Sequence, residues 1–284
     1  YESATSHPHA QHLTLDDYDA LFADLAALGT IFMAFTGGEI FLRQDALDVV
    51  ALARRHRFAV TLFTSGTLVD EAKADRIREL KVSEVHVSVY SHDPATHDAF
   101  TRSPGSHANS VRALSMLQSR GVRTVLKANI LRINIDHIDE LMVLATSLGA
   151  DVQLDPSVRV RMDGDRAPLD FQVSPEEIMR KVLVRPDLAP AFRKHAPEQL
   201  CTGERSVLDD DIVMCGAARD VISIAADGSI YACGFFSVAA GRWHPGERLS
   251  DIWFGSRQLD AIRETTFAKM SACSSCGVKT TCNP

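Results

Sequence analysis

The feature that most constrains the fold is a regular alternation of short apolar segments and amphipathic segments over the first half of the chain. Five runs rich in Val, Ile, Leu and Phe predict strands at 31–36, 58–64, 84–90, 122–130 and 151–154. Between and before them, 3.6-residue periodicity predicts helices at 15–28, 46–55, 70–80, 111–120 and 135–148. This alternation is typical of βα units on a parallel sheet buried on both faces. We therefore expect an α/β barrel or doubly wound sheet, with bound chemistry at the carboxyl ends of its strands.

The composition excludes several classes of protein. The 284 residues are 45% hydrophobic and 24% charged, so the chain can bury a large core without disulfides. A net charge of −7 and the absence of any long basic run argue against nucleic acid as a partner. No apolar run approaches the roughly 20 residues that span a bilayer, so we expect no membrane insertion.

The pattern changes after Pro156. A polar loop leads to Ser174 and Pro175, which together predict a capped helix start. Further on, Asp227 and Gly228 separate two short apolar runs and so predict a β-hairpin. We expect three parts: a barrel domain at 1–158, a bridging region at 159–212 and a small cysteine-rich module with a hairpin at 213–284.

Polar residues and glycines follow the predicted strands. Gly37 and Gly38 lack a Cβ and stand beside Glu39, an arrangement that suits a ligand with an ammonium group. A tight turn with a solvated glutamate is the alternative. Other strand ends contribute further candidates for binding or catalysis, namely Ser65, Ser88, Tyr90, Arg102, Asn129 and Asp155.

All six cysteines lie in the last third of the chain, at Cys201, Cys215, Cys233, Cys273, Cys276 and Cys282. Such segregation is unusual for a secreted disulfide protein and favours a local metal module in the cytoplasm. Clustered thiolates suit an iron–sulfur centre, although a Cys-x-x-Cys pair is also a zinc ligand set. Buried free cysteines are the remaining alternative.

Together these motifs resemble the radical S-adenosylmethionine enzymes that carry a SPASM domain. The resemblance is carried by Gly-Gly-Glu after one strand, Thr-Ser-Gly after the next, and C-x₁₂-G-x₄-C followed by C-x-x-C-x₅-C. It covers nearly the whole chain and implies a partial (β/α)₆ barrel. In this family a [4Fe–4S] cluster reductively cleaves S-adenosylmethionine, and the resulting 5′-deoxyadenosyl radical abstracts a substrate hydrogen.

The resemblance also implies roles for individual residues. The methionine ammonium would be held by Gly37, Gly38 and Glu39, and the methionine carboxylate and ribose would be bound near Ser65 and Ser88. Arg102 and Asn129 match cofactor-binding positions, and Tyr90 and Asp155 are the candidates for a catalytic role.

The cysteines would hold one or two auxiliary [4Fe–4S] clusters. By the resemblance, Cys215 and Cys233 are ligands of the first cluster, and Cys273, Cys276 and Cys282 are ligands of the second. Cys201 has two open interpretations, as an extra ligand of the first cluster or as a residue without a role at the metal.

Three departures from the family pattern matter. The defining C-x-x-x-C-x-x-C motif is absent, and Tyr1 stands where the aromatic residue beside its third cysteine is expected. The chain stops at Pro284, before a further expected cysteine, so we expect a truncation at both ends and ligands of the radical-generating cluster outside the given chain. Gly234 occupies the position at which sulfatase maturases have an aspartate, which disfavours sulfatase maturation.

The expected function is the oxidative modification of a ribosomally made peptide, with or without a leader, by abstraction of a C–H hydrogen and formation of a cross-link. A reducing flavodoxin or ferredoxin would supply the electron. Two alternatives stay open: the same radical chemistry on a tetrapyrrole or sugar, and a zinc-stabilised binding module without catalysis.

Overall fold

The computed structural model describes residues 12–161, 163–188, 191 and 215–271, and they fall into two compact units. The described part of the first unit runs from Gly29 to Ala191, and the second unit combines residues 12–28 with residues 215–271. Helix α1 (Leu15–Ala27) therefore belongs with the cysteine-bearing part of the chain rather than with the sheet. The sequence-based boundaries near residues 158 and 212 stay predictions.

The first unit contains a five-stranded parallel sheet whose strands lie in chain order, as the sequence pattern predicts. The strands are β1 (Phe32–Phe35), β2 (Ala59–Thr64), β3 (Glu84–Ser88), β4 (Thr124–Asn129) and β5 (Asp151–Asp155). Each strand pairs with the next one, so all carboxyl ends lie at one edge of the sheet. The α/β fold class is confirmed.

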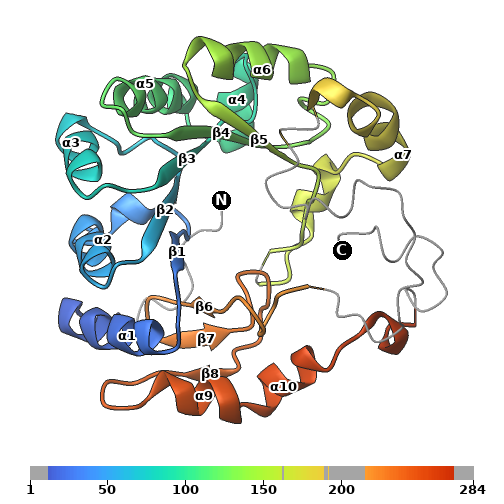
Figure 1. Cartoon of the computed structure of the whole chain (residues 1–284). Helices are drawn as coiled ribbons and strands as arrows, with labels where there is room; N and C mark the ends of the chain where they lie inside the picture. The colour runs from blue at the N-terminus through green and yellow to red at the C-terminus, as the bar shows by residue number, and fades with distance from the viewer. Residues whose placement is uncertain (1–11, 162, 189–190, 192–214, 272–284) are drawn as a thin grey trace. The chain divides into compact units, whose positions relative to one another are not determined.

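The outer face of the sheet carries α2 (Ala46–Arg55), α3 (Glu71–Glu79), α5 (Ser106–Gln118) and α6 (Ile138–Ser147) (Figure 1). Helix α4 (Pro94–Thr101) precedes α5 and packs against it. Alternate strand residues such as Val60, Leu62 and Val87 point towards these helices and are fully buried. This burial of apolar strand residues against amphipathic helices is the main stabilising interaction of the unit.

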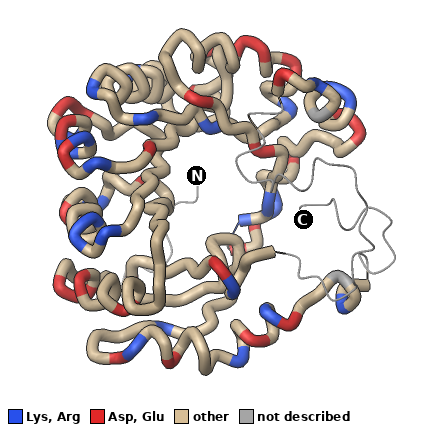
Figure 2. The backbone as a smooth tube through the Cα atoms, in the orientation of Figure 1, with Lys and Arg blue, Asp and Glu red and all other residues tan. Residues whose placement is uncertain are grey.

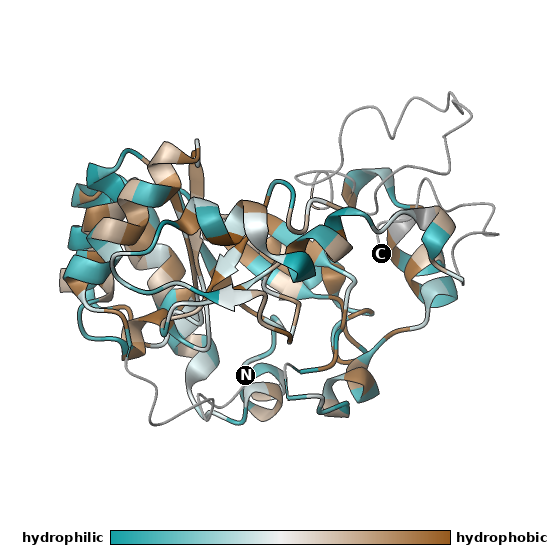
Figure 3. Ribbon diagram, turned by 90° about the horizontal axis from the view of Figure 1, so that it is seen from below, coloured by the Kyte–Doolittle hydropathy of each residue, from teal (hydrophilic) through white to brown (hydrophobic). Residues whose placement is uncertain are grey.

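Shorter elements follow the sheet. They are η1 (Ile40–Leu42), η2 (Ala167–Phe171), α7 (Pro175–Ile178), the π-helical turn η3 (Met179–Leu183) and η4 (Pro186–Leu188). The predicted helix start is confirmed, because the Ser174 hydroxyl accepts a hydrogen bond from the amide of Glu177. The helices carry both hydrophilic and hydrophobic residues (Figure 3). In the described ranges, none of them combines the length and apolarity required to cross a bilayer.

Helix α4 is not predicted by the sequence pattern, and α5 begins five residues before its predicted start at residue 111. The signals for α4 are present, since Asp93 caps the helix and Pro94 occupies its first turn. However, His97 is the one residue of this eight-residue helix that is buried, so the helix has almost no apolar periodicity. A helix without an apolar stripe is not visible to pattern analysis.

The inner face of the sheet carries the strand residues that point away from the helices. In register, Ser88 on β3 lies beside Lys127 on β4, and Lys127 lies beside Gln153 on β5. One step towards the amino ends, the ring centroids of Phe63 and His86 are 4.6 Å apart. Charged residues are frequent on the outer helices and sparse on the strands (Figure 2). Lys127 is the one Lys or Arg within the described strands of this sheet.

The second unit contains α1 and a small antiparallel sheet. Its other elements are β6 (Ser223–Ile224), β7 (Ser229–Tyr231), β8 (Gly241–Arg242), α9 (Leu249–Gly255), α10 (Arg257–Arg263) and η7 (Phe267–Lys269). A capping box between Thr14 and Asp17 starts α1. The amide of Leu249 donates to the carboxylate of Asp24 at 2.8 Å, which ties α9 to α1. The predicted hairpin is confirmed by the antiparallel pairing of β6 with β7.

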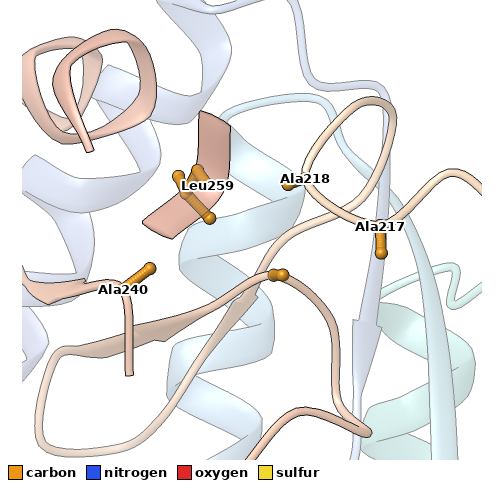
Figure 4. Close-up of a cluster of buried hydrophobic side chains, with 5 residues drawn as sticks. Ala217, Ala218, Ala240 and Leu259 are labelled. Carbon is orange, nitrogen blue, oxygen red and sulfur yellow. The ribbon is translucent and has the colours of Figure 1, made fainter. Parts of the chain in front are cut away.

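A small apolar cluster forms the centre of the cysteine-bearing segment (Figure 4). It consists of Ala217, Ala218, Ala232, Ala240 and Leu259, with Cys233, Phe236, Trp253 and Ile262 packed against it. The guanidinium of Arg263 lies over the Trp253 ring at 4.4 Å and donates to the carbonyls of Ala218 and Trp253. The small alanine side chains and the hydrogen bonds of the half-buried Arg263 thus let the chain segments around the cluster approach closely.

Gly66, which follows β2, supplies a stability test. Its φ is +77°, and an added Cβ would lie 2.9 Å from Val87 Cγ1 and 3.2 Å from Ser110 Cα. Gly66→Ala should lower the free energy of unfolding by about 2–4 kcal/mol, because it combines left-handed strain with overpacking. Urea unfolding measures this difference.

The matched control is Gly121→Ala. Gly121 has a similar φ of +72° but no atom within 4 Å of the added Cβ. The free energy of unfolding of Gly121→Ala should fall by only about 1 kcal/mol, the cost of the left-handed backbone conformation. Equal losses in the two variants would contradict the packing argument.

Candidate functional site

The carboxylate of Glu39 joins two strand ends at the carboxyl edge of the sheet. Its Oε1 accepts hydrogen bonds from the Phe41 amide at 3.2 Å and the Thr64 hydroxyl at 2.7 Å. Its Oε2 accepts from the amide of Ser65 at 2.8 Å and from the hydroxyl of the same residue. Three of these hydrogen bonds tie the loop after β1 to Thr64 and Ser65 at the end of β2, and together with the bond from Phe41 they fill the acceptor directions of the carboxylate. Glu39 is not the solvated turn residue of the alternative interpretation.

The turn after β2 is itself held against helix α5. The hydroxyl of Ser110 donates to the carbonyl of Ser65 at 2.6 Å, and the amide of Gly66 donates to the Thr64 hydroxyl at 3.0 Å. In contrast, an added Cβ at Gly37 would meet nothing within 4 Å, although its φ of +149° restricts substitution. The edge therefore combines a rigid wall at β2 with an open, exposed glycine backbone at β1, which a ligand can approach closely.

The remaining predicted cofactor residues have different surroundings. Ser88 ends β3 on the inner face, and among the described residues its hydroxyl makes no hydrogen bond. The Asn129 amide donates to the carbonyl of Ser157 at 3.0 Å. Arg102 is the exposed, left-handed C-cap of α4, with no ion pair in the described ranges. Ser88 thus has a hydroxyl available to a ligand, whereas the side chain of Asn129 is hydrogen-bonded to the loop after β5.

Asn134, a fully buried residue after β4, is not among the site residues predicted from the sequence. Its amide donates to the carbonyls of Tyr90 and Asn129 at 2.8 Å each, and its oxygen accepts from the Leu131 amide at 2.8 Å. These bonds join the ends of β3 and β4, much as Glu39 joins those of β1 and β2. A lone asparagine in a loop carries no sequence signal for such a role.

The two candidates for a catalytic role, Tyr90 and Asp155, both make contacts within the fold. The Tyr90 ring packs on Phe100, with centroids 4.8 Å apart, and the Tyr90 amide donates to Nδ1 of the buried His97 at 3.1 Å. Asp155 accepts a hydrogen bond from the Ser157 amide at 2.8 Å. These contacts give each residue a structural role, and a catalytic role for either stays a prediction.

Two of the six cysteines lie within the described residues. Cys215 is exposed and Cys233 is half-buried, and both are free thiols. The amide of Ala218 donates to the carbonyl of Ala232 at 3.0 Å, which brings the two cysteine-bearing segments together. The Cys233 sulfur accepts a hydrogen bond from the Phe235 amide at 3.4 Å. Cys201, Cys273, Cys276 and Cys282 lie outside the described residues, so their predicted ligation is a proposal.

Steric constraints explain the glycine within the C-x₁₂-G-x₄-C pattern. Gly228 has a φ of +86°, and an added Cβ would lie 2.5 Å from the carbonyl oxygen of Trp243. The amide of Trp243 donates to the Gly228 carbonyl at 2.9 Å, so the two backbones are locked together. Only glycine fits at this turn, which fixes the hairpin between the two cysteines.

A parallel sheet with an exposed glycine backbone at its carboxyl edge is typical of α/β proteins that bind a cofactor at the strand ends, and the second unit joins two cysteine-bearing segments. Comparison with known sequences identifies the family. Residues 1–145 match the Radical SAM superfamily, and residues 215–277 match the iron-sulfur cluster-binding domain known as SPASM. The chain belongs to the Radical SAM superfamily and carries a SPASM domain, as the sequence resemblance predicted.

Curated relatives are similar over most of the chain. The PqqA peptide cyclase of Granulibacter bethesdensis is 24% identical over 93% of this chain and 71% of the relative. The mycofactocin maturase MftC of Mycolicibacterium smegmatis is 27% identical over 89% of this chain and 65% of the relative. The AdoMet-dependent heme synthase of Methanosarcina barkeri is 21% identical over 99% of this chain and 84% of the relative.

Solved structures share the fold. Streptococcus suis SuiB bound to its precursor peptide SuiA has a TM-score of 0.75 and 16% identity, over 96% of this chain and 65% of SuiB. Native anSMEcpe with bound AdoMet has a TM-score of 0.70 and 15% identity, over 100% of this chain and 82% of that chain. The present chain thus spans about two thirds of SuiB.

The residues present fit two of the groups that this family binds, S-adenosylmethionine and an auxiliary cluster, whereas the cysteine motif of the radical-generating cluster is not in the given sequence. Membership implies S-adenosylmethionine and a [4Fe–4S] cluster, and the SPASM domain implies auxiliary iron–sulfur clusters. The open backbone at Gly37 and the available hydroxyl of Ser88 suit a polar cosubstrate. The hydrogen bond from an amide to the Cys233 sulfur suits a thiolate, because such bonds stabilise negative charge on cluster sulfurs.

The His97 environment gives a prediction for pH dependence. Burial, with a smaller contribution from neighbouring His107, lowers the pKa of His97 to about 4. The unfolded chain has an ordinary histidine pKa near 6.5, so it binds more protons than the folded chain between pH 6.5 and 4. Stability should therefore fall as the pH falls through this window, with His97 contributing a loss of about 1.4 kcal/mol between pH 7.5 and 5.5.

Urea unfolding at both pH values measures this loss, with His97→Asn as the comparison. The asparagine oxygen can accept the Tyr90 amide but does not titrate, so the variant should lose less stability on acidification than the wild type. An identical loss in both proteins would contradict the assignment.

Proposed function

We propose that this protein is a peptide-modifying radical S-adenosylmethionine enzyme. It would abstract a hydrogen from an unactivated C–H bond of a ribosomally made peptide and form an oxidised product such as a cross-link. The observation that carries the proposal is the joint presence of the Glu39-bound strand edge and the paired cysteine segments in a chain with both family domains. Its similarity to a peptide cyclase and a peptide maturase, and to SuiB in complex with a precursor peptide, supports the substrate class.

The residues of the sheet edge would bind and orient the cosubstrate. When bound, the cluster and S-adenosylmethionine supply the 5′-deoxyadenosyl radical that performs the hydrogen abstraction. The exposed backbone of Gly37 and Gly38 would receive the methionine ammonium, while Glu39 keeps this loop in place from the β2 side. Ser65 and Ser88 would contact the methionine carboxylate and the ribose. The rigid turn at Gly66 limits motion of this wall, which favours a single orientation of the reacting groups.

The second unit would hold the auxiliary clusters, with Cys215 and Cys233 on one and the last three cysteines on the other. These clusters would accept the electron that is released when the oxidised product forms. The chain fixes the Cys233 sulfur through the Phe235 amide and fixes the hairpin through Gly228. We further propose a reducing flavodoxin or ferredoxin as the electron donor and a cytoplasmic location, where thiols stay reduced.

The proposal is tested on the intact protein purified without oxygen. With dithionite, S-adenosylmethionine should yield 5′-deoxyadenosine, and a peptide substrate should lose two mass units for each cross-link. Zinc in place of iron, with no 5′-deoxyadenosine, would instead favour the zinc-stabilised binding module. Turnover of a tetrapyrrole or sugar, with no change in any peptide, would favour the other alternative.

Substitution of one cysteine should distinguish the contribution of the auxiliary cluster from that of the radical-generating site. Cys233→Ala should lower the iron content by about four atoms per chain, the content of one [4Fe–4S] cluster, because a thiolate ligand is lost. Cleavage of S-adenosylmethionine without peptide should persist, whereas peptide modification should fall at least tenfold. Iron analysis and product assay measure both effects.

Val238→Ala is the matched control in the same segment, since Val238 is 71% exposed. It should keep the full iron content and activity. Unchanged iron in Cys233→Ala would exclude Cys233 as a ligand.

A further inference from the structure

Lys127 has an unusual position for a charged residue. It lies on β4, the fourth of five strands, and points to the inner face of the sheet with Ser88 and Gln153 beside it in register. Its neighbours on β4 confirm this orientation, because the Thr124 hydroxyl donates to Gln118 of helix α5 on the opposite face. Lys127 is only partly exposed. A lysine in this position is costly unless its ammonium group has a partner.

The ammonium group of Lys127 is satisfied poorly within the described residues. It lies 4.8 Å from the centroid of the Phe63 ring, and it makes no hydrogen bond or ion pair there. Other partly buried cations of the chain do have such partners. Arg120 pairs with Glu71 and Asp75, and Lys181 pairs with Asp136 and Glu177. Three ammonium N–H donors of Lys127 are thus left for a ligand.

The charge of Lys127 is sensitive to its surroundings. Burial lowers the pKa of Lys127, and the carboxylate of Asp155 acts in the opposite direction. Asp155 does not form an ion pair with it, and its Oδ1 accepts from the Ser157 amide. An incoming carboxylate would supply the missing anion and would form a charge-assisted hydrogen bond, which is stronger than the contact with an aromatic ring.

We propose that Lys127 binds a carboxylate of the peptide substrate on the inner face of the sheet, beside Ser88. This inference rests on the proposed function, because it assigns a chemical class to the peptide: an Asp or Glu side chain, or a carboxyl terminus, lies near the modified residue. The Phe63 ring, 4.6 Å from His86, provides the apolar floor beneath the ammonium group. Lys127 is therefore a specificity-determining residue.

The test uses short synthetic peptides in matched pairs, in which each Asp or Glu is replaced by Asn or Gln and the terminus is free or amidated. Binding to the intact, cluster-loaded protein is measured by fluorescence anisotropy. The wild type should bind the acidic members about tenfold more tightly than their neutral partners. Lys127→Met, which keeps the apolar stem, should lose this preference, and Lys127→Arg should retain it.

Lys73→Met is the control for the loss of one positive charge. Lys73 lies on α3 at the outer face, where it pairs with Asp70. This variant should retain the full preference for acidic peptides. If the wild type shows no preference, including no binding of either member, or if Lys127→Met keeps the preference, the inference is overturned.

A second measurement distinguishes the peptide from the cosubstrate as the source of the carboxylate. Equilibrium dialysis with S-adenosylmethionine should give affinities within twofold for the wild type and Lys127→Met. A tenfold weaker affinity in the variant would assign the ammonium group to the methionine carboxylate and overturn the inference. Wild-type protein that forms no 5′-deoxyadenosine would contradict the proposed function itself, which is a separate result.

Discussion

The carboxylate of Glu39 is the interaction on which the candidate site depends most. Parallel pairing puts the ends of β1 and β2 at one edge of the sheet, but it does not fix the loops that follow. Glu39 does so by accepting hydrogen bonds from Thr64 and Ser65. Because the loop after β1 contains two exposed glycines, few other contacts restrain it. A polar network with every acceptor filled is costly to break, so the backbone at Gly37 stays accessible in one conformation.

The sheet could be predicted from the sequence because its strands are rich in Val, Ile, Leu and Phe and alternate with helix-length segments, although only alternate residues of β2, for example, are buried. Helix α2 was predicted with its observed bounds, 46–55, since Val49, Val50 and Ala53 form an apolar stripe. Helix α4 escaped prediction because its stability comes from the Asp93 cap and from one buried histidine. Periodicity reports burial, and an element that buries little is recognised only by its caps.

The site was predicted less completely. The residue types at Glu39, Ser65 and Ser88 were evident, but the hydrogen bonds between Glu39 and Ser65 join residues 26 positions apart and follow from strand register. Register also explains why Lys127 was overlooked, since a lysine in a strand has the same sequence signature whether it faces solvent or an inner surface. Gly228 shows the opposite case. The motif that contains Gly228 could be recognised in the sequence. The reason that only glycine fits there, the close carbonyl of Trp243, could be seen only in the structure.

The inner face of the sheet differs from both a core and a solvated surface. A core face would be apolar, and a solvated face would pair its charges, yet here Lys127 lies over Phe63 and no carboxylate of the described residues is in contact with it. Contact with an aromatic ring compensates only part of the lost hydration of an ammonium group. The part of the hydration free energy that is not compensated is largest when water is excluded from this face, and a bound carboxylate would compensate it. The strand edge and the inner face therefore have separate tasks: Glu39 shapes the edge identically for every substrate, whereas Lys127 makes binding depend on the charge of the peptide.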